Sequence, residues 1–306
     1  MITKAMAMLF MYCCACTNAF SQSYFYNNSY YDNDFLFEVN ASIGAMNCFT
    51  DLGGRANEGK GFIKDLNIPF TKLCGGAGAA FVYRYMIGVR FALNAGTIEA
   101  SDNILRHDKS AGGVNRYKRN LHFRSDIQEL LLLTEVYPFT ILGAFREKHS
   151  RLLPYLTGGT GMFWFNPQTY INGARVNLQP LHTEGQGFDE YPDRQVYKLN
   201  QVNFPVGCGF KYELSPLCNL RLEMLYRITT TDYLDDVSTR YIDPAYFKKY
   251  LSPGNAGLAV LLHDRQSEIN SQHTTIPGSI RGRNSRNDGY FAIQLNAGLI
   301  LGRQRR

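Results

Sequence analysis

The chain has 306 residues, with 20 Tyr, 20 Phe and 28 Gly against one Trp, and a formal net charge of +6. This composition is unusual for a soluble enzyme of this length, whereas the aromatic girdles and closely packed glycines of a membrane barrel account for it. The basic residues fall in predicted loops and a C-terminal tail, so we expect a solvated surface and no nucleic-acid partner.

The N-terminal residues have the three regions of a secretory signal peptide. Lys4 precedes an apolar run over residues 5–16, and small residues stand three and one positions before Gln22. Residues 1–21 are therefore expected to be a cleaved signal peptide, and residues 22–306 a single barrel domain.

The next segments alternate apolar and polar residues with period two, which is typical of strands with one apolar face. Residues 35–47, 77–85 and 87–95 follow this pattern, and the last two meet at a tight turn around Met86. No later window approaches the roughly 20 apolar residues that a transmembrane helix needs. A membrane location therefore requires a closed barrel, in which every backbone polar group is paired.

Five further strands follow in the sequence. The strand predicted over residues 123–137 is the least regular, because Leu131 and Leu133 share a parity with glutamates, and we expect both leucines to face the lumen. The strand over residues 155–165 ends in an aromatic cluster typical of a membrane interface. The remaining strands are expected over residues 204–214, 220–228 and 290–301.

The links between these strands alternate in length. Long polar stretches follow the first, third, fifth and seventh strands, and much shorter links follow the others. Outer-membrane barrels have short periplasmic turns and long extracellular loops, whereas a soluble sandwich has no reason to alternate in this way. We therefore predict an all-β fold, an eight-stranded antiparallel transmembrane β-barrel in the outer membrane, surrounded by lipid. The long stretches are residues 50–72, 99–122, 166–201 and 232–287.

The alternation also predicts a lipid-facing side, and the third long loop contains a hairpin signal. Asn172-Gly173 favours a tight turn, so part of that loop is expected to extend the fifth strand beyond the membrane. The predicted lipid-facing residues are Phe81, Val89, Leu132, Phe210, Leu222 and Ile293.

The short link at Ser215 and Pro216 predicts the register of the sixth and seventh strands. Closing it places Leu214 opposite Leu220. Opposite charges then face each other on the inner side, each pair contributing a few tenths to about 1 kcal/mol. The predicted pairs are Glu213 with Arg221 and Lys211 with Glu223.

The polar parity of the strands carries five acidic and five basic residues. An eight-stranded barrel is just wide enough for its side chains to fill the interior, and an unpaired buried charge is very costly. We therefore expect a self-neutralised plug and no conducting pore. The predicted lumenal network is Glu38, Arg84, Arg90, Glu129, Glu135, Lys211, Glu213, Arg221, Glu223 and Arg227.

The sequence offers no convincing catalytic, cofactor or metal site. All six histidines lie outside the lipid-facing segments, and none forms a Ser-His or Asp-His pattern, so no enzymatic activity and no cofactor are expected. The acidic run with Asp232, Asp235, Asp236 and Asp243 lacks the spacing and glycine of a calcium loop. Solvated carboxylates and turn capping are favoured over calcium binding.

The basic residues of the second long loop allow two interpretations. They could touch lipid phosphate at the outer leaflet, but simple solvation is favoured. These residues are Arg106, Lys109, Arg116, Lys118, Arg119 and Arg124.

Four cysteines remain after the predicted signal peptide: Cys48, Cys74, Cys208 and Cys218. None has zinc-site spacing. Cys48 ends the first strand and Cys74 opens the second, so a disulfide is possible, but unpaired thiols are favoured because sequence does not show the required Cβ geometry. A lipoprotein anchored at Cys16 is a weak alternative.

Several stretches resemble the PorG-like outer-membrane barrels. The most specific is the run T-D-Y-L-D-D-V-S-T over residues 231–239, and the others are R-N-L-H-F-R at 119–124, L-Q-P-L-H-T-E-G-Q-G at 178–187 and F-P-V-G-C-G-F-K-Y at 204–212. The resemblance covers most of residues 35–244 and the final strand. The residues that carry the family motif are Thr231, Asp232, Tyr233, Asp235 and Asp236.

This resemblance implies a component of the type IX secretion system, associated with a periplasmic ring of PorK-like and PorN-like subunits. A periplasmic partner can reach the short-turn side, where the link at residues 138–151 is the longest. Its apolar and basic residues fit an interface or a continuation of the strand into the membrane interface. The alternative function is a structural or adhesive OmpA-like barrel. The predicted contact residues are Phe139, Phe145, Arg146 and Lys148.

Overall fold

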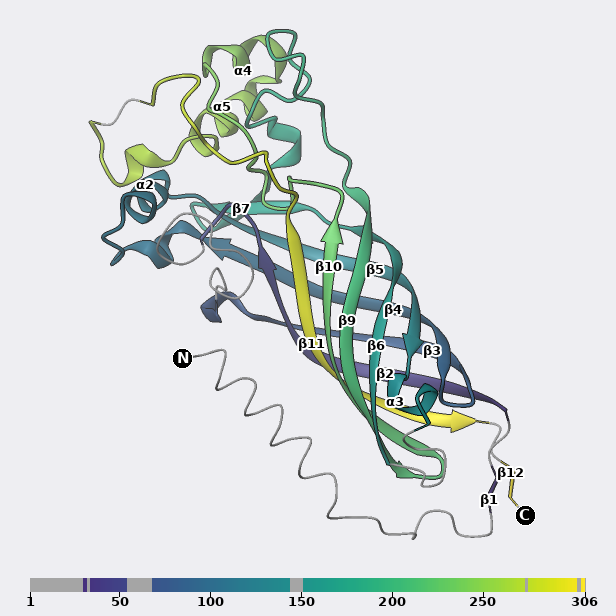
Figure 1. The fold of residues 1–306 in the computed structure, drawn as a ribbon. Coiled ribbons are helices and arrows are strands. Elements are labelled where there is room, and N and C mark those ends of the chain that lie inside the picture. Colours follow the sequence, from purple (N-terminus) through teal and green to yellow (C-terminus); the bar gives the residue numbers. More distant parts are fainter. Residues whose placement is uncertain are drawn as a thin grey trace.

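The computed structural model describes residues 30–31, 34–53, 68–143, 151–272, 275–301 and 304–305. Eight long strands form a closed antiparallel barrel (Figure 1), in the order β4-β3-β2-β11-β10-β9-β6-β5, with β5 pairing back onto β4. Antiparallel pairing of every strand on both sides leaves no open edge. The predicted signal peptide lies outside the described residues.

Each of the eight predicted strands is confirmed. Most extend past the predicted alternation, as β4 does to Ser101 and β9 from Asn200, because pairing continues into polar residues at the loop end. The strands are β2 (Phe35–Phe49), β3 (Lys72–Tyr83), β4 (Ile87–Ser101), β5 (His122–Val136), β6 (Leu152–Trp164), β9 (Asn200–Ser215), β10 (Cys218–Thr229) and β11 (Gly289–Leu301).

The outer face of the barrel is apolar, as the alternation predicts. All six residues predicted to face lipid are exposed, among them Leu222, which is 52% exposed. Leu131 and Leu133 instead pack in the lumen against Leu225 and Ala92, so the two irregular leucines of β5 are confirmed as lumenal. Within the described residues, no helix is long and apolar enough to cross a membrane.

The two ends of the barrel differ in size (Figure 1). The long loops gather at one end, and we call their described residues, 51–53, 102–121, 166–199 and 230–288, the outer lobe. Its helices are α2 (Ala111–Arg119), α4 (Ala245–Tyr250) and α5 (Pro253–Leu262), with 3-10 turns η3 (Asp102–Leu105), η4 (Gln179–Leu181) and η5 (Gln266–Glu268). Another 3-10 turn, η2 (Ile68–Phe70), precedes β3.

The opposite end has the short turns. It also has α3 (Pro138–Ile141) and a two-residue ribbon in which β1 (Tyr30–Tyr31) pairs with β12 (Gln304–Arg305). The first residue of β2 and the last of β11 lie at this end too (Figure 1). Because outer-membrane barrels have short turns in the periplasm, this is the periplasmic end.

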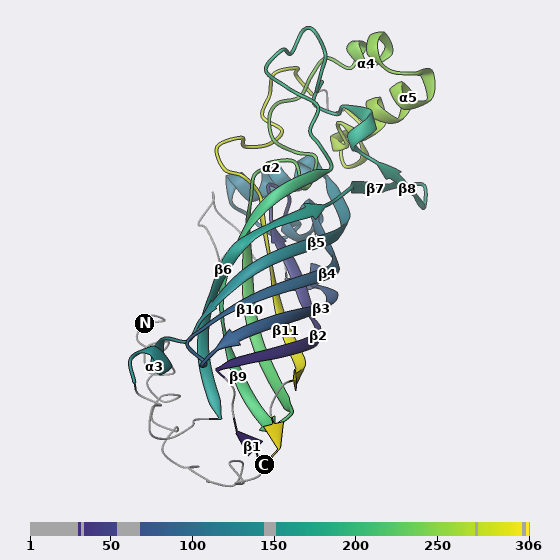
Figure 2. The ribbon, with the colours of Figure 1, turned by 90° about the vertical axis from the view of Figure 1, so that its right-hand side faces the viewer.

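The predicted hairpin in the third long loop is present. It consists of β7 (Pro167–Ile171) and β8 (Ala174–Asn177), which project from the top of the barrel in Figure 2. Asn172 and Gly173 have φ of 50° and 79°, the left-handed pair that a type I′ turn needs. Since β7 also pairs with β5 at Arg124 and Ser125, the hairpin continues the sheet beyond the barrel.

The predicted register of β9 and β10 is wrong by two residues. Leu220 lies opposite Tyr212, and Arg221 lies opposite Lys211, so two like charges are neighbours. The Ser215 hydroxyl oxygen accepts hydrogen bonds from the backbone N–H groups of Leu217 and Cys218, and the register shifts between Cys218 and Asn219. The predicted pairs Glu213–Arg221 and Lys211–Glu223 therefore do not form: Asn219 faces Glu213, and Gly209 faces Glu223.

The four described cysteines are free thiols. Cys74 lies opposite Gly44 of β2, whereas Cys48 stands further along β2 and pairs with Tyr290 of β11. The two residues are therefore not cross-strand partners, and the disulfide that the sequence left open does not form.

Candidate functional sites in the lumen and the outer lobe

The lower half of the lumen holds a buried cluster of alternating charges. The Glu38 carboxylate takes ion pairs from both Lys211 and Arg221, which explains how two neighbouring cations are tolerated. Arg221 also reaches Glu135 at 2.8 Å, and Arg90 pairs with Glu135 at 3.2 Å and with Glu223. These six side chains are almost completely buried, so the cluster has to neutralise itself.

A second, smaller cluster lies nearer the outer lobe. Glu129 pairs with Arg227, whose Nε lies 3.2 Å away, and accepts hydrogen bonds from the Tyr290 hydroxyl at 2.8 Å and the Asn94 amide at 3.0 Å. The apolar layer of Leu131, Leu133 and Leu225 lies at the level between the two clusters. Beside it is a cavity with room for about one water molecule.

Of the predicted lumenal network, Arg84 lies elsewhere and Glu213 stands at the edge of the lumen. Arg84 sits in the β3–β4 turn with φ of 47°, is 55% exposed and pairs with Asp34 at 2.7 Å. The turn begins at Arg84, so the strand alternation that placed it inside has already ended. Glu213 is half-buried near the short-turn end, where it accepts a hydrogen bond from the Tyr85 hydroxyl at 2.5 Å. Among the described residues, the buried part of the lumen holds four acids and four bases: Glu38, Glu129, Glu135 and Glu223 with Arg90, Lys211, Arg221 and Arg227.

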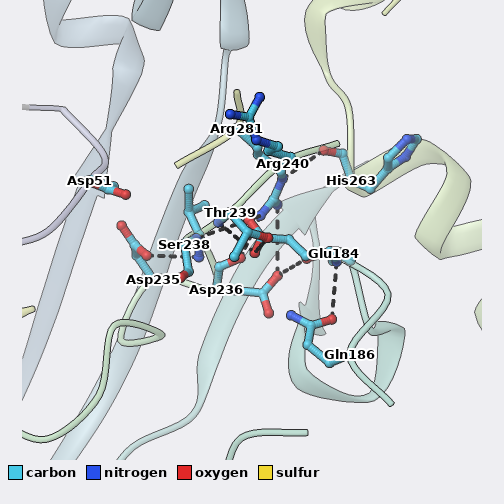
Figure 3. A network of polar contacts seen from close by, with 12 residues as sticks. Asp51, Glu184, Gln186, Asp235, Asp236, Ser238, Thr239, Arg240, His263 and Arg281 are labelled. Atoms are coloured by element: carbon cyan, nitrogen blue, oxygen red, sulfur yellow. Dashed lines mark hydrogen bonds and ion pairs between the residues drawn. The ribbon is translucent and has the colours of Figure 1, made fainter. Parts of the chain in front are cut away.

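The outer lobe contains a second polar network, centred on Glu184 and Arg281 (Figure 3). Arg281 Nη1 donates to Glu184 Oε1 at 2.9 Å and to the Asp236 carbonyl at 2.6 Å. Glu184 also accepts from the backbone N–H groups of Ser238 and Thr239 at 3.0 and 2.9 Å. The turn at Glu184–Gly185 is thereby fixed to the run at residues 236–239.

Asp236 is held from the other side by the third loop. Its carboxylate accepts hydrogen bonds from the Thr183 hydroxyl at 2.5 Å and the Tyr197 hydroxyl at 2.7 Å. The Tyr197 ring stacks on Tyr233, with centroids 4.8 Å apart. Two loops that are distant in sequence therefore share one buried network.

Arg119 joins the first, second and fourth loops. It forms a bidentate pair with Asp102, with both N···O distances at 2.8 Å, and donates to the backbone carbonyls of Asp51 at 2.8 Å and Arg281 at 2.6 Å. Asp235 adds a further link, because its carboxylate accepts from the Leu52 N–H at 3.2 Å. All four long loops are thus tied together above the barrel.

Burial changes the titration of the lobe carboxylates. It raises the pKa of Asp236 to about 6 and that of Asp232 to about 8. Burial together with the nearby Asp51 carboxylate raises the pKa of Asp235 well above its ordinary range, and burial together with Asp235 does the same for Asp288. The Asp235 and Asp288 carboxyl groups accept backbone N–H groups, whereas Asp236 accepts two hydroxyls and lies 3.9 Å from Arg281.

The prediction of solvated loop charges is wrong for several residues. Asp235, Asp236 and Arg119 are buried, because the loops fold over an apolar core that is shared with the adjoining end of the barrel and includes Leu234 and Phe247. Turn capping is confirmed, since Asp235 accepts from the Val237 N–H at 2.9 Å and Asp243 from the Ala245 N–H at 2.9 Å. No group of three or more His, Cys, Asp or Glu in the described ranges is arranged to hold a metal ion.

The other motif residues support the same turn. Thr231 is buried, its carbonyl accepts from the Asp288 N–H at 3.0 Å, and its hydroxyl oxygen accepts from the Tyr233 N–H at 3.1 Å. Asp232 is half-buried beside them. In the sequence Glu184 stands out only as part of the T-E-G-Q-G run at residues 183–187, and no motif marks Arg281.

The predicted partner contacts are only partly described. Phe139 lies on α3 and is partly exposed, together with Ile141 and Leu142, which is 79% exposed. These side chains form an apolar ledge at the periplasmic end. Phe145, Arg146 and Lys148 lie outside the described residues.

Comparison with known proteins gives likenesses of fold. No protein-family model matches the sequence, and no curated protein matches it. Ail, the attachment invasion locus protein of Yersinia pestis, is 7% identical with a TM-score of 0.34, covering 87% of this chain and 97% of that one. Neisserial surface protein A is 7% identical with a TM-score of 0.35 and the same coverage. A major outer membrane protein of Thermus thermophilus is 14% identical with a TM-score of 0.37, covering 88% and 100%.

The strand pairing itself determines the class of protein. A closed barrel with an apolar outer face and a charged, filled lumen satisfies the requirements of a membrane-spanning sheet. The chain is therefore a multi-pass β-barrel of the outer membrane.

Proposed function

We propose that this barrel is a non-catalytic, PorG-like outer-membrane component of the type IX protein secretion system, which docks a periplasmic ring of PorK-like and PorN-like subunits. Within this proposal, residues 1–21 are the signal peptide and residues 22–306 form one domain. The supporting observation is that two stretches carrying the resemblance, residues 183–187 and 231–239, bind each other through Glu184. Residues that give the sequence its family likeness thus form one structural unit.

The filled lumen supports a docking role over transport through the barrel. Four acids and four bases close its interior, and the cavity beside them has room for about one water molecule. Cargo of protein size has no path along this axis. The work of the barrel is therefore expected at its two ends.

The apolar ledge on α3 is the part of the periplasmic end that best suits a protein partner. Ile141, the last residue of a short helix that begins two residues after β5, and Leu142, the residue after it, are exposed. Apolar side chains at the centre of an interface supply much of its binding energy. The ledge also fits insertion into the inner leaflet, and the experiment below distinguishes the two roles.

The test is a double substitution, Ile141→Ser with Leu142→Ser, in the full-length chain. We expect loss of ring-subunit co-purification and of cargo secretion, with unchanged heat-modifiable gel mobility of the barrel. A matched control is Ile276→Ser on the outer lobe, which is 74% exposed but on the opposite side. Retained co-purification and secretion in the double variant would place the contact elsewhere.

The alternative function is a structural or adhesive OmpA-like barrel. The observation that favours it is a well-packed outer lobe with exposed apolar side chains, Leu261, Ile276 and Ile280. In that case Ile276→Ser with Ile280→Ser should reduce cell adhesion, while a strain lacking the chain still secretes normally. Lost secretion in that strain supports the first proposal.

A further inference from the structure

The seam between β6 and β9 is interrupted near its middle. Pairing runs up to Gly158 opposite Val206 and resumes at Gly161 opposite Asn203 in the same register. Gly159, opposite Pro205, and Thr160, opposite Phe204, are not paired in this ladder. Among the described strand pairs of the barrel wall, every other seam runs without an internal gap, and the bulge at Cys218 lies beside a turn.

Pro205 explains the gap. Its carbonyl oxygen lies 3.6 Å from the position that a Cβ on Gly158 would occupy, so this part of its backbone faces β6. In an antiparallel ladder a residue directs its N–H and C=O toward the same neighbour, and proline has no N–H. The missing donor therefore belongs to the β6–β9 ladder, and in hydrocarbon no water replaces it.

Glycines remove the side-chain contacts at the same level. Gly159 and Gly161 of β6 and Gly207 of β9 share the lumenal parity, so no side chains bridge the seam there. A Cβ on Gly159 would lie 2.0 Å from the Leu132 carbonyl oxygen, so this close approach of β5 requires glycine. Cross-strand side-chain pairs, which stabilise a sheet, are absent from the lumenal face of this part of the seam.

Two apolar side chains lie behind the gap. Leu131 and Leu225 extend toward Gly161 and Gly207, and they belong to the apolar layer between the two charged clusters. The Arg227–Glu129 pair joins β10 to β5 beside Pro205, so the opening is local to the gap. We infer that the β6–β9 seam is a lateral opening point, at which the barrel wall separates toward the bilayer. This inference does not depend on the proposed secretion role.

The first test is amide hydrogen exchange of the full-length protein in lipid nanodiscs. The reference is the uninterrupted β2–β11 seam, where Ile43 lies opposite Leu295. We expect the Gly159 and Gly161 amides to exchange about tenfold faster than the Ile43 and Leu295 amides, because local opening frees them first. Equal or slower exchange at Gly159 and Gly161 overturns the inference.

The second test restores the missing donor with Pro205→Val. We expect exchange at Gly159 and Gly161 to slow to the level of the reference seam, and the folded gel band to persist to a higher temperature. Pro154→Val is the matched control, because Pro154 lies in the same strand pair where its register with Phe210 is continuous. Unchanged exchange in the Pro205 variant, or the same slowing in the Pro154 variant, contradicts the inference.

Discussion

The lumen and the outer lobe bury charge in opposite ways. Among the described residues, the lumen pairs four acids with four bases, whereas the lobe buries five acids, Asp102, Glu184, Asp235, Asp236 and Asp288, with only two arginines, Arg119 and Arg281. The surplus lobe carboxylates accept backbone N–H groups, as Asp288 does from Leu234 at 3.0 Å. The backbone N–H and C=O groups of the strands already form hydrogen bonds with neighbouring strands. The lumenal charges therefore have to pair with each other. Irregular loops have orphaned N–H groups, which carboxylates can satisfy.

This difference predicts a fixed charge pattern in the lumen and a pH-dependent one in the lobe. The following experiments test that contrast.

The largest effect is expected from breaking a lumenal pair. Arg227→Met leaves the buried Glu129 carboxylate without its cation, which should cost about 3–5 kcal/mol of stability in bilayer refolding titrations. Adding Glu129→Gln should recover most of the loss, because the charge is then gone. A single variant as stable as the wild type would show that the pair does not stabilise the barrel.

Removal of a buried cation from the outer lobe should have an effect on stability that depends on pH. Arg281→Met leaves Glu184 and Asp236 without their cation and should cost the lobe about 3–5 kcal/mol at pH 8. At pH 5 the loss should be about 1 kcal/mol smaller, because Asp236, with a pKa of about 6, is then protonated. Limited proteolysis of the lobe at both pH values measures the difference. A loss that does not vary with pH contradicts the contrast.

A charge on the lipid face gives the next largest effect. Leu222→Arg should cost about 2–4 kcal/mol of membrane stability. Leu261→Arg on α5 is the control, since Leu261 is 55% exposed but lies in the outer lobe, and it should cost little. If both variants were equally stable in a bilayer refolding titration, the wall and the outer lobe would not differ in the cost of an exposed arginine.

Mild acid should stabilise the lobe. The pKa of Asp232 is about 8 in the folded state, against an ordinary 3.8. The contribution of its protonation to the free energy of unfolding is therefore fully present below pH 3.8 and is lost as the pH rises through 8. Burial lowers the pKa of His182 and His263, which opposes this below about pH 6.5. Between pH 8 and 6.5 we therefore expect a gain of about 1 kcal/mol, kept small because Asp232 is only half-buried.

Protease resistance of the lobe between these pH values provides the measurement. Asp232→Asn should flatten the profile. A lobe that becomes more sensitive at pH 6.5 than at pH 8 would mean that the histidines dominate.

The smallest signal is expected from conductance. The paired lumenal charges, and a cavity between them with room for about one water molecule, predict no steady current in planar bilayers. Reproducible single-channel steps from the wild type would require the charged clusters to rearrange.

Periodicity predicted the wall but not the connections. Alternation over residues such as Phe81 and Leu222 depends only on local sequence, so all eight strands could be predicted. The β9–β10 register depends on how Ser215 caps its turn, and the position of Arg84 depends on where β3 ends. In the lobe, Glu184 and Arg281 are 97 residues apart, and no repeating pattern links them. Their burial follows from tertiary packing, which a local reading of charged loops does not detect.

The hydrogen bond between Asp51 and Arg283 in the outer lobe has a consequence for the order in which the protein folds. Asp51 lies two residues after β2, the first barrel strand, and accepts a hydrogen bond from the N–H of Arg283, which precedes β11, the last barrel strand. The two residues are 232 positions apart in the chain, so their contact carries a large loop-closure entropy until β11 has paired with β2. The lobe can thus be completed only on a closed barrel. Acquisition of protease resistance by the loops should therefore be the last step of folding, after the wall has formed.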